Sequence, residues 1–186
     1  RANIHMHYAI SLQTLGDLNK AKTEFEIALS FHQLSHLADN PQLDINRFHL
    51  HMYYANALST LGFFYDAKTE YEKALTLHQL PHLVVDNRLD GERAILYMNY
   101  AITLKYLGNF TSSKSKFEIA LSLYRLPHVV ENKKFNASRA SLHMNHANIL
   151  SELGDLHNSK SEYEAALSLL QLPFLTDDIE QDATRA

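Results

Sequence analysis

The pair Leu-Gly recurs four times in this 186-residue chain at a constant spacing. Its glycines are each 46 residues after the one before: Gly16, Gly62, Gly108 and Gly154. Two alanine series keep the same register, Ala9, Ala55, Ala101 and Ala147, and Ala28, Ala74, Ala120 and Ala166. A regular period of this size predicts stacked copies of one small unit, each of which buries its apolar face against its neighbours.

Four copies of this unit cover almost the whole chain. We place them at about residues 1–43, 44–89, 90–135 and 136–181, with residues 182–186 beginning a further copy. The sequence therefore predicts a single repeat array over residues 1–186. Length alone would have suggested one or two globular domains.

The composition excludes several classes of protein. Hydrophobic residues make up 46% of the chain and charged residues 20%, which fits a folded chain and not a disordered one. The net charge is only −4 and the lysines and arginines are scattered, so nucleic acid is not expected as a partner. No apolar run approaches the ~20 residues of a membrane span. The absence of cysteine excludes disulfides and thiolate metal sites.

The second copy indicates what each unit should look like. Asp44 has the character of a helix N-cap, and the same register holds Asp90, Asn136 and Asp182. A first helix is expected from Asp44 to about Leu61, apolar on two sides and therefore buried between neighbours. Gly62 should end it, because glycine takes the left-handed conformation of a C-terminal cap at little steric cost.

A second helix is expected from about Phe64 to Leu80, with one apolar stripe at helical spacing. Its other side carries Lys68 and Glu72, and this pair recurs in the other three copies. Such pairs contribute only about a few tenths of a kcal/mol each and indicate a solvated outer face. Pro81 should stop this helix. The linker of about ten residues that follows is expected to lie across the edge of the stack.

This unit resembles the tetratricopeptide repeat. In the second copy the match runs through Tyr54-Ala55-Asn56-Ala57-Leu58, Gly62, Ala67, Tyr71, Ala74-Leu75 and Leu77. His51 replaces the family's first-helix tryptophan, and Ser113 and Ser159 replace its first small alanine. The period of 46 is longer than the family's and is similar to that of kinesin light chain-type repeats. The resemblance implies an all-α fold, a right-handed α-solenoid of four antiparallel helix pairs.

The resemblance also implies where a partner would bind. In this family the first helices line a groove that usually takes an extended peptide. The side chains expected to contact such a peptide or protein partner are His7, Tyr53, Asn56, Asn99, Lys105, Asn145 and Asn148. Asparagine can pair with a peptide backbone through a donor and an acceptor together. The basic clamp of chaperone-binding members is not expected, because methionine stands at its lysine position in every copy (Met6, Met52, Met98 and Met144). A merely solvated polar face remains the alternative interpretation.

Twelve histidines invite a metal-site hypothesis. Two pairs have the i, i+4 spacing that can chelate a metal on a helix, His32/His36 and His78/His82. Pro81 interrupts the second pair, and the third and fourth copies have Tyr124 and Leu170 in place of the first histidine. The register of His51 also holds His5, His143 and Tyr97, which indicates packing within the hairpin. No metal or other cofactor is expected. No nucleophile elbow, phosphate loop or carboxylate pair indicates an enzyme.

Two functions remain open. The favoured one is a noncatalytic scaffold that binds a partner protein along the groove. The alternative is a structural element that assembles head to tail, since Arg1 and Arg185 share one register and uncapped ends make open-ended contacts. A cytoplasmic location is favoured over secretion, without fixing the compartment. Glycosylation at Asn109 or Asn136 would matter only in a secreted chain.

Overall fold

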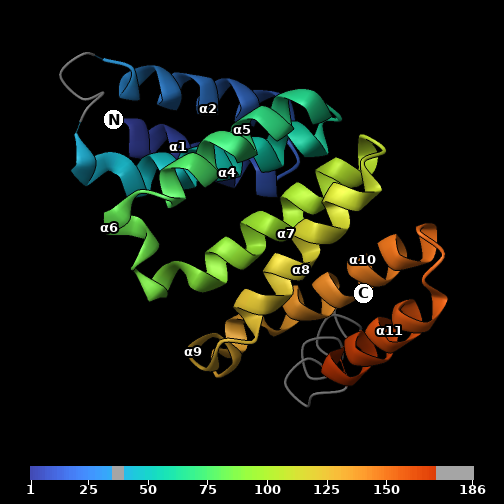
Figure 1. The fold of residues 1–186 in the computed structure, drawn as a ribbon. Helices are drawn as coiled ribbons and strands as arrows, with labels where there is room; N and C mark the ends of the chain where they lie inside the picture. Colours follow the sequence, from blue (N-terminus) through green and yellow to red (C-terminus); the bar gives the residue numbers. More distant parts are fainter. Residues whose placement is uncertain (35–39, 171–186) are drawn as a thin grey trace, which may run out of the picture. The chain divides into compact units, whose positions relative to one another are not determined.

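The computed structural model describes residues 1–34 and 40–170, and this part of the chain contains helices and no strand (Figure 1). The long helices are α1 (Ala2–Thr14), α2 (Leu18–His32), α4 (Asp44–Thr60), α5 (Phe64–His78), α7 (Asp90–Tyr106), α8 (Phe110–Tyr124), α10 (Asn136–Glu152) and α11 (Leu156–Leu170). Among the described helices, none is long and apolar enough to cross a membrane.

The helices fall into two compact units, residues 1–87 and 88–186. Each unit holds two helical hairpins, α1–α2 and α4–α5 in the first and α7–α8 and α10–α11 in the second. The first helices α4, α7 and α10 begin at Asp44, Asp90 and Asn136, which keeps the 46-residue spacing. The predicted hairpin is therefore confirmed, although α5 ends at His78 and not at Leu80.

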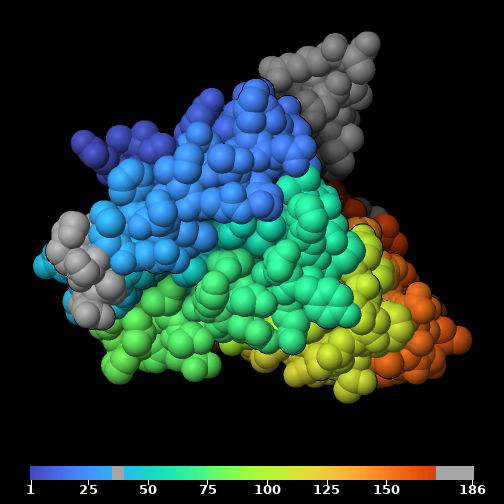
Figure 2. Space-filling view, turned by 90° about the horizontal axis from the view of Figure 1, so that it is seen from above, coloured from blue at the N-terminus to red at the C-terminus, as the bar shows by residue number. Residues whose placement is uncertain are grey.

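Each hairpin packs against the next one in its unit. In the first unit α4 contacts both α2 and α5, and Figure 2 shows the blue atoms of α2 directly against the blue-green atoms of the following hairpin. In the second unit α10 contacts α8 and α11. The alanines of both series are buried in these packed helices. Small side chains there let helix axes approach closely, and aromatic rings such as Phe25 and Phe117 fill the space between them.

Glycine makes the turn inside every hairpin. The glycines of the four Leu-Gly pairs have φ between 74° and 85°, the left-handed region that other residues rarely adopt. In the second copy the amide of Phe63 donates to the carbonyl of Leu58 at 2.9 Å across this turn. Three second helices are then capped by the side chain that follows the glycine, Asp17, Asn109 and Asp155. The predicted C-terminal stop is thus confirmed.

The predicted N-caps of the first helices are wrong. Asp44 is the first helical residue of α4, and its side chain caps no backbone amide. The reason is η1 (Pro41–Leu43), a 3-10 turn that leads directly into α4. The carbonyl of Pro41 in this turn already accepts a hydrogen bond from the amide of Asp44. The side-chain cap is Asn40, which accepts from the amide of Gln42 at 3.0 Å. Asp90 and Asn136 likewise make no cap bond, and Asp182 lies outside the described residues.

The linkers are more ordered than the sequence indicated. Pro81 does not only follow α5; it is the first residue of a short helix, α6 (Pro81–Val84), where proline's missing amide costs nothing. A 3-10 turn, η2 (Asn87–Leu89), completes the linker, and the third copy repeats the arrangement with α9 (Pro127–Val130) and η3 (Lys133–Phe135). Leu83 and Leu89 are buried, as expected for a linker that lies on the helices, whereas Val85 is exposed.

Two buried serines form hydrogen bonds at a position where the repeat family has alanine. Ser113 and Ser159 are buried at the position where the first two copies have Ala21 and Ala67. Their hydroxyls donate to the carbonyls of Ala101 and Ala147 at 2.7 and 2.8 Å. The bond satisfies a buried polar group and ties the second helix of each hairpin to the first.

Gly91, in the first turn of α7, gives a direct test of the packing between copies in the second unit. A Cβ at this position would lie 2.1 Å from Cζ of Phe135. Alanine ordinarily stabilises a helix over glycine by about 0.5–1 kcal/mol. Gly91→Ala should nevertheless lower the free energy of unfolding by roughly 1–3 kcal/mol, because the ring must move.

Urea denaturation measures this change. The double variant Gly91→Ala/Phe135→Leu serves as the control, since leucine stands at the equivalent positions 43 and 89. It should recover most of the loss. A Gly91→Ala variant more stable than the parent would contradict the proposed contact.

Candidate peptide-binding surface

The side chains expected to meet a ligand lie on the solvent-facing sides of the first helices. We call this set the polar face: His7, Ile10, Gln13 and Thr14 on α1, Tyr53, Asn56, Ser59 and Thr60 on α4, Asn99, Ile102, Lys105 and Tyr106 on α7, and Asn145, Asn148, Ser151 and Glu152 on α10. All of them are exposed or partly exposed, and only Lys105 and Glu152 carry a full charge. A nearly neutral surface favours hydrogen bonds and apolar contacts over ion pairs.

Within each unit the predicted contact residues lie on first helices that contact each other. In the first unit α1 contacts α4, which places His7 on a helix beside the one that carries Tyr53 and Asn56. In the second unit α7 contacts α10, which pairs the helix of Asn99 and Lys105 with that of Asn145 and Asn148. Each unit therefore has its own part of the polar face.

Some of these asparagines already have partners inside the protein. The hydroxyl of Tyr71 donates to Oδ1 of Asn56 at 2.6 Å, and that of Tyr163 donates to Oδ1 of Asn148 at 2.5 Å. Nδ2 of Asn145 donates to the carbonyl of Ser141 within the same helix at 2.9 Å. The tyrosine partners of Asn56 and Asn148 lie 15 residues further along the chain, so no local pattern indicates them.

Behind the polar face, a repeated histidine–glutamate pair joins the two helices of a hairpin. Nδ1 of His51 donates to Oε2 of Glu70 at 2.6 Å, and His5–Glu24 and His143–Glu162 repeat both the distance and the 19-residue separation. This confirms the expectation that these histidines serve hairpin packing. Burial raises the pKa of Glu70, but hydrogen bonds from His51 and Lys73 outweigh it and hold that pKa below its ordinary value.

The third copy has a cation–π contact in place of the histidine–glutamate pair. Tyr97 replaces the histidine and Lys116 replaces the glutamate. Nζ of Lys116 lies 5.7 Å from the ring centroids of both Tyr97 and Tyr100, a distance at which a cation is attracted to an aromatic face. Both residues of the histidine–glutamate pair are replaced in this copy. The new pair still provides a favourable contact between α7 and α8.

The aspartates that begin α4 and α7 each contact a histidine in a linker helix. Oδ1 of Asp44 accepts from Nη1 of Arg47 at 2.6 Å, and Oδ2 lies 3.2 Å from Nε2 of His82 in α6. Asp90 makes the same two contacts, with Arg93 and with Nε2 of His128 in α9. These carboxylates are buried, and the guanidinium groups of Arg47 and Arg93 offset part of the cost of removing them from water.

The outer sides of the second helices are occupied by lysine–glutamate pairs. Nζ of Lys22 lies 2.5 Å from Oε1 of Glu26, and the corresponding pairs in the later copies lie at 3.6 to 3.8 Å. The expected outer face is confirmed. It offers a matched control surface for experiments on the polar face.

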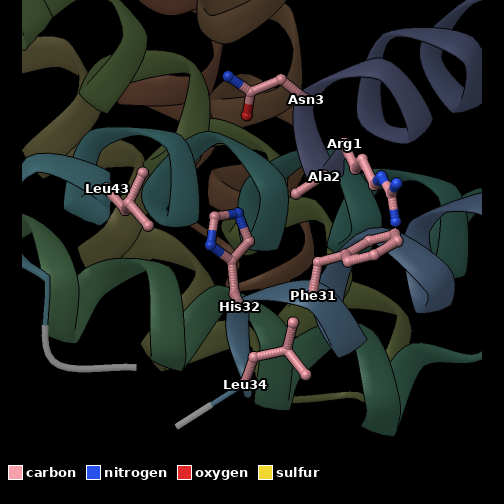
Figure 3. A pocket seen from close by; sticks show the side chains of 7 residues that line it. All are labelled: Arg1, Ala2, Asn3, Phe31, His32, Leu34 and Leu43. Carbon is pink, nitrogen blue, oxygen red and sulfur yellow. The ribbon is translucent and has the colours of Figure 1, made fainter. Parts of the chain in front are cut away.

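Two hollows are lined by residues outside the polar face. One, of about 480 Å³ in the first unit, is lined mainly by apolar side chains together with Arg1, Asn3 and His32 (Figure 3). The other, of about 520 Å³, lies between α10 and α11 and is lined by Ala140, Ser141, Met144, Tyr163, Ala166, Leu167 and Leu170. Burial and the nearby charges of Arg47 and His51 lower the pKa of His32, so the first hollow contains a largely neutral imidazole at pH 7.

The histidine pairs considered for metal binding have other surroundings. His78 belongs to α5, whereas His82 belongs to α6 and lies beside Asp44. His36 lies outside the described residues. In residues 1–34 and 40–170, no group of three His, Asp or Glu side chains has the geometry of a metal site. Asn136, one of the two glycosylation candidates, is buried, whereas Asn109 is exposed.

Comparison with known proteins identifies the repeat. Residues 140–169 match the sequence family described as Tetratricopeptide repeat. This segment covers most of α10, the turn and nearly all of α11, which together form the hairpin of the fourth copy. The fourth copy therefore matches the tetratricopeptide repeat in sequence. A search of curated proteins finds no match to the sequence.

Solved structures support the same fold along most of the chain. BtubC (BKLC) from P. vanneervenii superposes with a TM-score of 0.72 at 20% identity, over 90% of this chain and 62% of that protein. Pseudomonas aeruginosa pilF gives 0.62 at 17% identity, over 99% of this chain and 72% of that one. A MamA protein gives 0.61 at 15% identity, over 90% and 72%.

These comparisons confirm the all-α, tetratricopeptide-like solenoid class. The chain spans less than two thirds of BtubC, and identities this low establish the fold alone. Folds of the tetratricopeptide type generally mediate protein–protein interaction and scaffolding, without catalysis of their own. The likeness to the long repeats of kinesin light chain stays a prediction.

The pH dependence of stability at Glu162 tests whether the histidine–glutamate pairs stabilise the fold. Burial raises the pKa of Glu162, but the hydrogen bond from His143 and the imidazole of His146, 3.6 Å away, outweigh it and lower the pKa to about 2. The unfolded carboxyl, with an ordinary value of 4.5, takes up a proton first. The free energy of unfolding should therefore fall as pH is lowered from about 4.5 to about 2.

Glu162→Gln lacks this carboxyl and should lose less unfolding free energy than the parent over that interval, as measured by urea denaturation. Glu164→Gln, on the exposed outer face, is the matched control and should follow the parent curve. If the Glu162→Gln and parent curves run parallel through the interval, the pair does not have the assigned role.

Proposed function

We propose that this chain is a noncatalytic scaffold that binds an extended peptide segment of a partner protein along the polar face. The observation that carries the proposal is the arrangement of that face. Adjacent first helices keep asparagine, tyrosine and histidine side chains accessible, whereas the outer sides of the second helices are filled by lysine–glutamate pairs. A peptide backbone can pair with amide side chains whatever its sequence.

The polar face has few charged side chains, and this limits the kind of partner that it can bind. Lys105 and Glu152 are the charged members of the polar face, and they have opposite signs. A ligand held there depends on backbone hydrogen bonds and apolar contacts, so its affinity should change by less than about threefold between about 50 and 500 mM salt. Neither nucleic acid nor a membrane surface would behave in this way. The cytoplasmic location favoured by the sequence stays part of the proposal.

Selection from a displayed library of random 12-residue peptides tests the proposal. Selected peptides should lose about tenfold or more in affinity, close to 1.4 kcal/mol, for the variant Tyr53→Ala/Asn99→Ala. The matched control Lys68→Ala/Lys114→Ala alters the outer face and should bind like the parent. Fluorescence polarisation measures both affinities, and circular dichroism verifies that both variants remain folded.

Two results would contradict the proposal. One is a selection that yields no peptide binding more tightly than about 100 μM. The other is a set of peptides that lose affinity for the outer-face control and not for the polar-face variant.

A second candidate function is head-to-tail assembly. Ile4 on α1 is 73% exposed, although the equivalent Leu50 on α4 is buried. Leu167 on α11 is 57% exposed, although the equivalent Leu121 is buried. These two faces have the chemistry to pair between molecules. Light scattering over a concentration series, with electron microscopy, would detect growing assemblies; a constant monomeric mass at high concentration would exclude them.

A further inference from the structure

The linker of the third copy is basic, whereas the sequence of every other linker is acidic. Residues 125–139 contain four lysines and arginines and one acidic residue, Glu131. The equivalent stretches 33–47, 79–93 and 171–185 each contain more acidic than basic residues. The net charge of the whole chain is −4, so positive charge is concentrated at this one linker against the overall composition.

The four basic side chains belong to elements that contact one another. Arg125 is the C-cap of α8, Lys133 and Lys134 belong to η3, and Arg139 lies near the start of α10. The short helix α9 contacts α8 and η3, and η3 contacts α10 (Figure 1, at the label α9). Arg139 is partly exposed and the other three are exposed. We call this set the linker patch.

Arg139 differs from the arginines at the same register in its hydrogen-bond partner. Arg47 and Arg93 each pair with an aspartate three residues earlier. In the fourth copy that residue is Asn136, whose Oδ1 accepts from Nη1 of Arg139 at 3.1 Å. An amide oxygen accepts a hydrogen bond but carries no full charge. In the part of the chain that the structure describes, no carboxylate pairs with Arg139, so its charge is not offset there by an ion pair.

Two of the cations border one buried pair of aromatic rings. Nζ of Lys134 lies 4.6 Å from the ring centroid of Phe135, and that ring lies 5.9 Å from the ring of Tyr124. Burial raises the pKa of the Tyr124 hydroxyl to about 12, whereas the charge of Arg139 acts to lower it. Arg139 is therefore close enough to Tyr124 for its charge to be felt there, and the aromatic pair connects it with Lys134.

The carboxylates near the linker patch offset only part of its charge. Glu131 is exposed at the C-cap of α9. Asp90 contacts Nε2 of His128 in α9, but it is buried and already paired with Arg93. The first turn of α10 contains no acidic residue, whereas that of α7 contains Asp90 and Glu92. The patch therefore has a net positive charge that attracts a negatively charged partner.

We propose that the linker patch is a second binding surface, which holds an acidic, extended segment of a partner protein. A guanidinium group binds a carboxylate through two parallel hydrogen bonds, and lysines contribute compact charges beside it. Four cations on a chain of net charge −4 suit a short acidic segment better than a long nucleic acid. The linker patch shares no residue with the polar face, so this inference does not depend on the proposed function.

Titration of two capped peptides into the full chain labelled with nitrogen-15 tests the inference. Ac-Glu-Gly-Glu-Gly-Glu-NH2 carries three carboxylates, and Ac-Gln-Gly-Gln-Gly-Gln-NH2 is its uncharged match. At about 50 mM salt the glutamate peptide should bind about tenfold or more tightly than the glutamine peptide, and it should shift the backbone amide signals of residues 125–139. Its affinity should fall about fivefold or more at about 500 mM salt, because salt screens exposed charges.

Removing two charges from the linker patch should weaken this binding selectively. Arg125→Gln/Lys134→Gln changes exposed side chains and should lower the affinity for the glutamate peptide by about tenfold. The matched control Lys68→Gln/Lys160→Gln removes the same charge from the outer face and should bind within about twofold of the parent, because these sites are remote from the patch and screened by salt. Circular dichroism verifies that both variants remain folded.

Two single substitutions should move the affinity in opposite directions. Asn136→Asp supplies Arg139 with the carboxylate that the equivalent arginines have, and it should weaken the glutamate peptide by about threefold. Glu131→Gln removes the opposing charge and should strengthen binding by about twofold. The two substitutions change the net charge by one unit in opposite senses, which a loss of structure in the linker would not reproduce.

Several results would overturn the inference. These are equal binding of the glutamate and glutamine peptides, equal weakening by the linker-patch and outer-face variants, and tighter binding of an oligonucleotide of twelve thymidines than of the glutamate peptide. Salt-sensitive self-association that shifts the signals of residues 125–139 would assign the surface to a second copy instead.

The polar-face variant separates this inference from the proposed function. Tyr53→Ala/Asn99→Ala should leave the affinity for the glutamate peptide within about twofold of the parent, because the two surfaces have no residue in common. Loss of glutamate-peptide binding in that variant would place the acidic segment on the polar face and refute the linker patch. The selection of 12-residue peptides tests the proposed function whichever result is obtained here.

Discussion

The close approach of neighbouring helices at the alanine positions is the constraint on which the rest of the structure depends. Ala9, Ala55 and Ala101 in the first helices and Ala28, Ala74 and Ala120 in the second are fully buried. With so little side-chain volume at the crossings, the two helices of a hairpin and the next hairpin can pack at interior density. The same arrangement leaves one side of each first helix accessible. The stacking that stabilises the fold therefore also creates the polar face.

Helix pairs, turn glycines and buried alanines could be predicted because each leaves a periodic signal in the sequence. The caps and linkers could not. Asp44 has an ideal capping side chain, but the 3-10 turn before it supplies the backbone acceptor, and the carboxylate is used instead by Arg47 and by His82, which is 38 residues away. A local pattern does not reveal a partner so distant in sequence. Pro81 gave a correct stop signal, yet proline is equally suited to begin the short helix that forms there.

The location of the candidate site followed from the resemblance to a known repeat, whereas its internal contacts did not. Asn56 and Asn148 were expected to face a ligand, but the pattern within a single copy does not indicate the tyrosines that donate to them. A signal was nevertheless present. Aligning the four copies with one another shows tyrosine only where asparagine stands opposite, and lysine at position 116 only where tyrosine replaces histidine at position 97. Internal copies can thus reveal contacts between helices that no single copy shows.

Hydrogen exchange of the Ala120→Glu variant tests most directly whether adjacency alone stabilises this chain. Ala120 lies in the core of the second unit together with Leu142 and Ile149 of the following hairpin. A glutamate there buries a charge at the helix crossing. Because each repeat is stabilised by its neighbours, we predict loss of amide protection in α8 and α10, with protection in α1 and α2 retained. A uniform loss across residues 1–34 and 40–170 would contradict the account, because it would mean that all the helices share one common core.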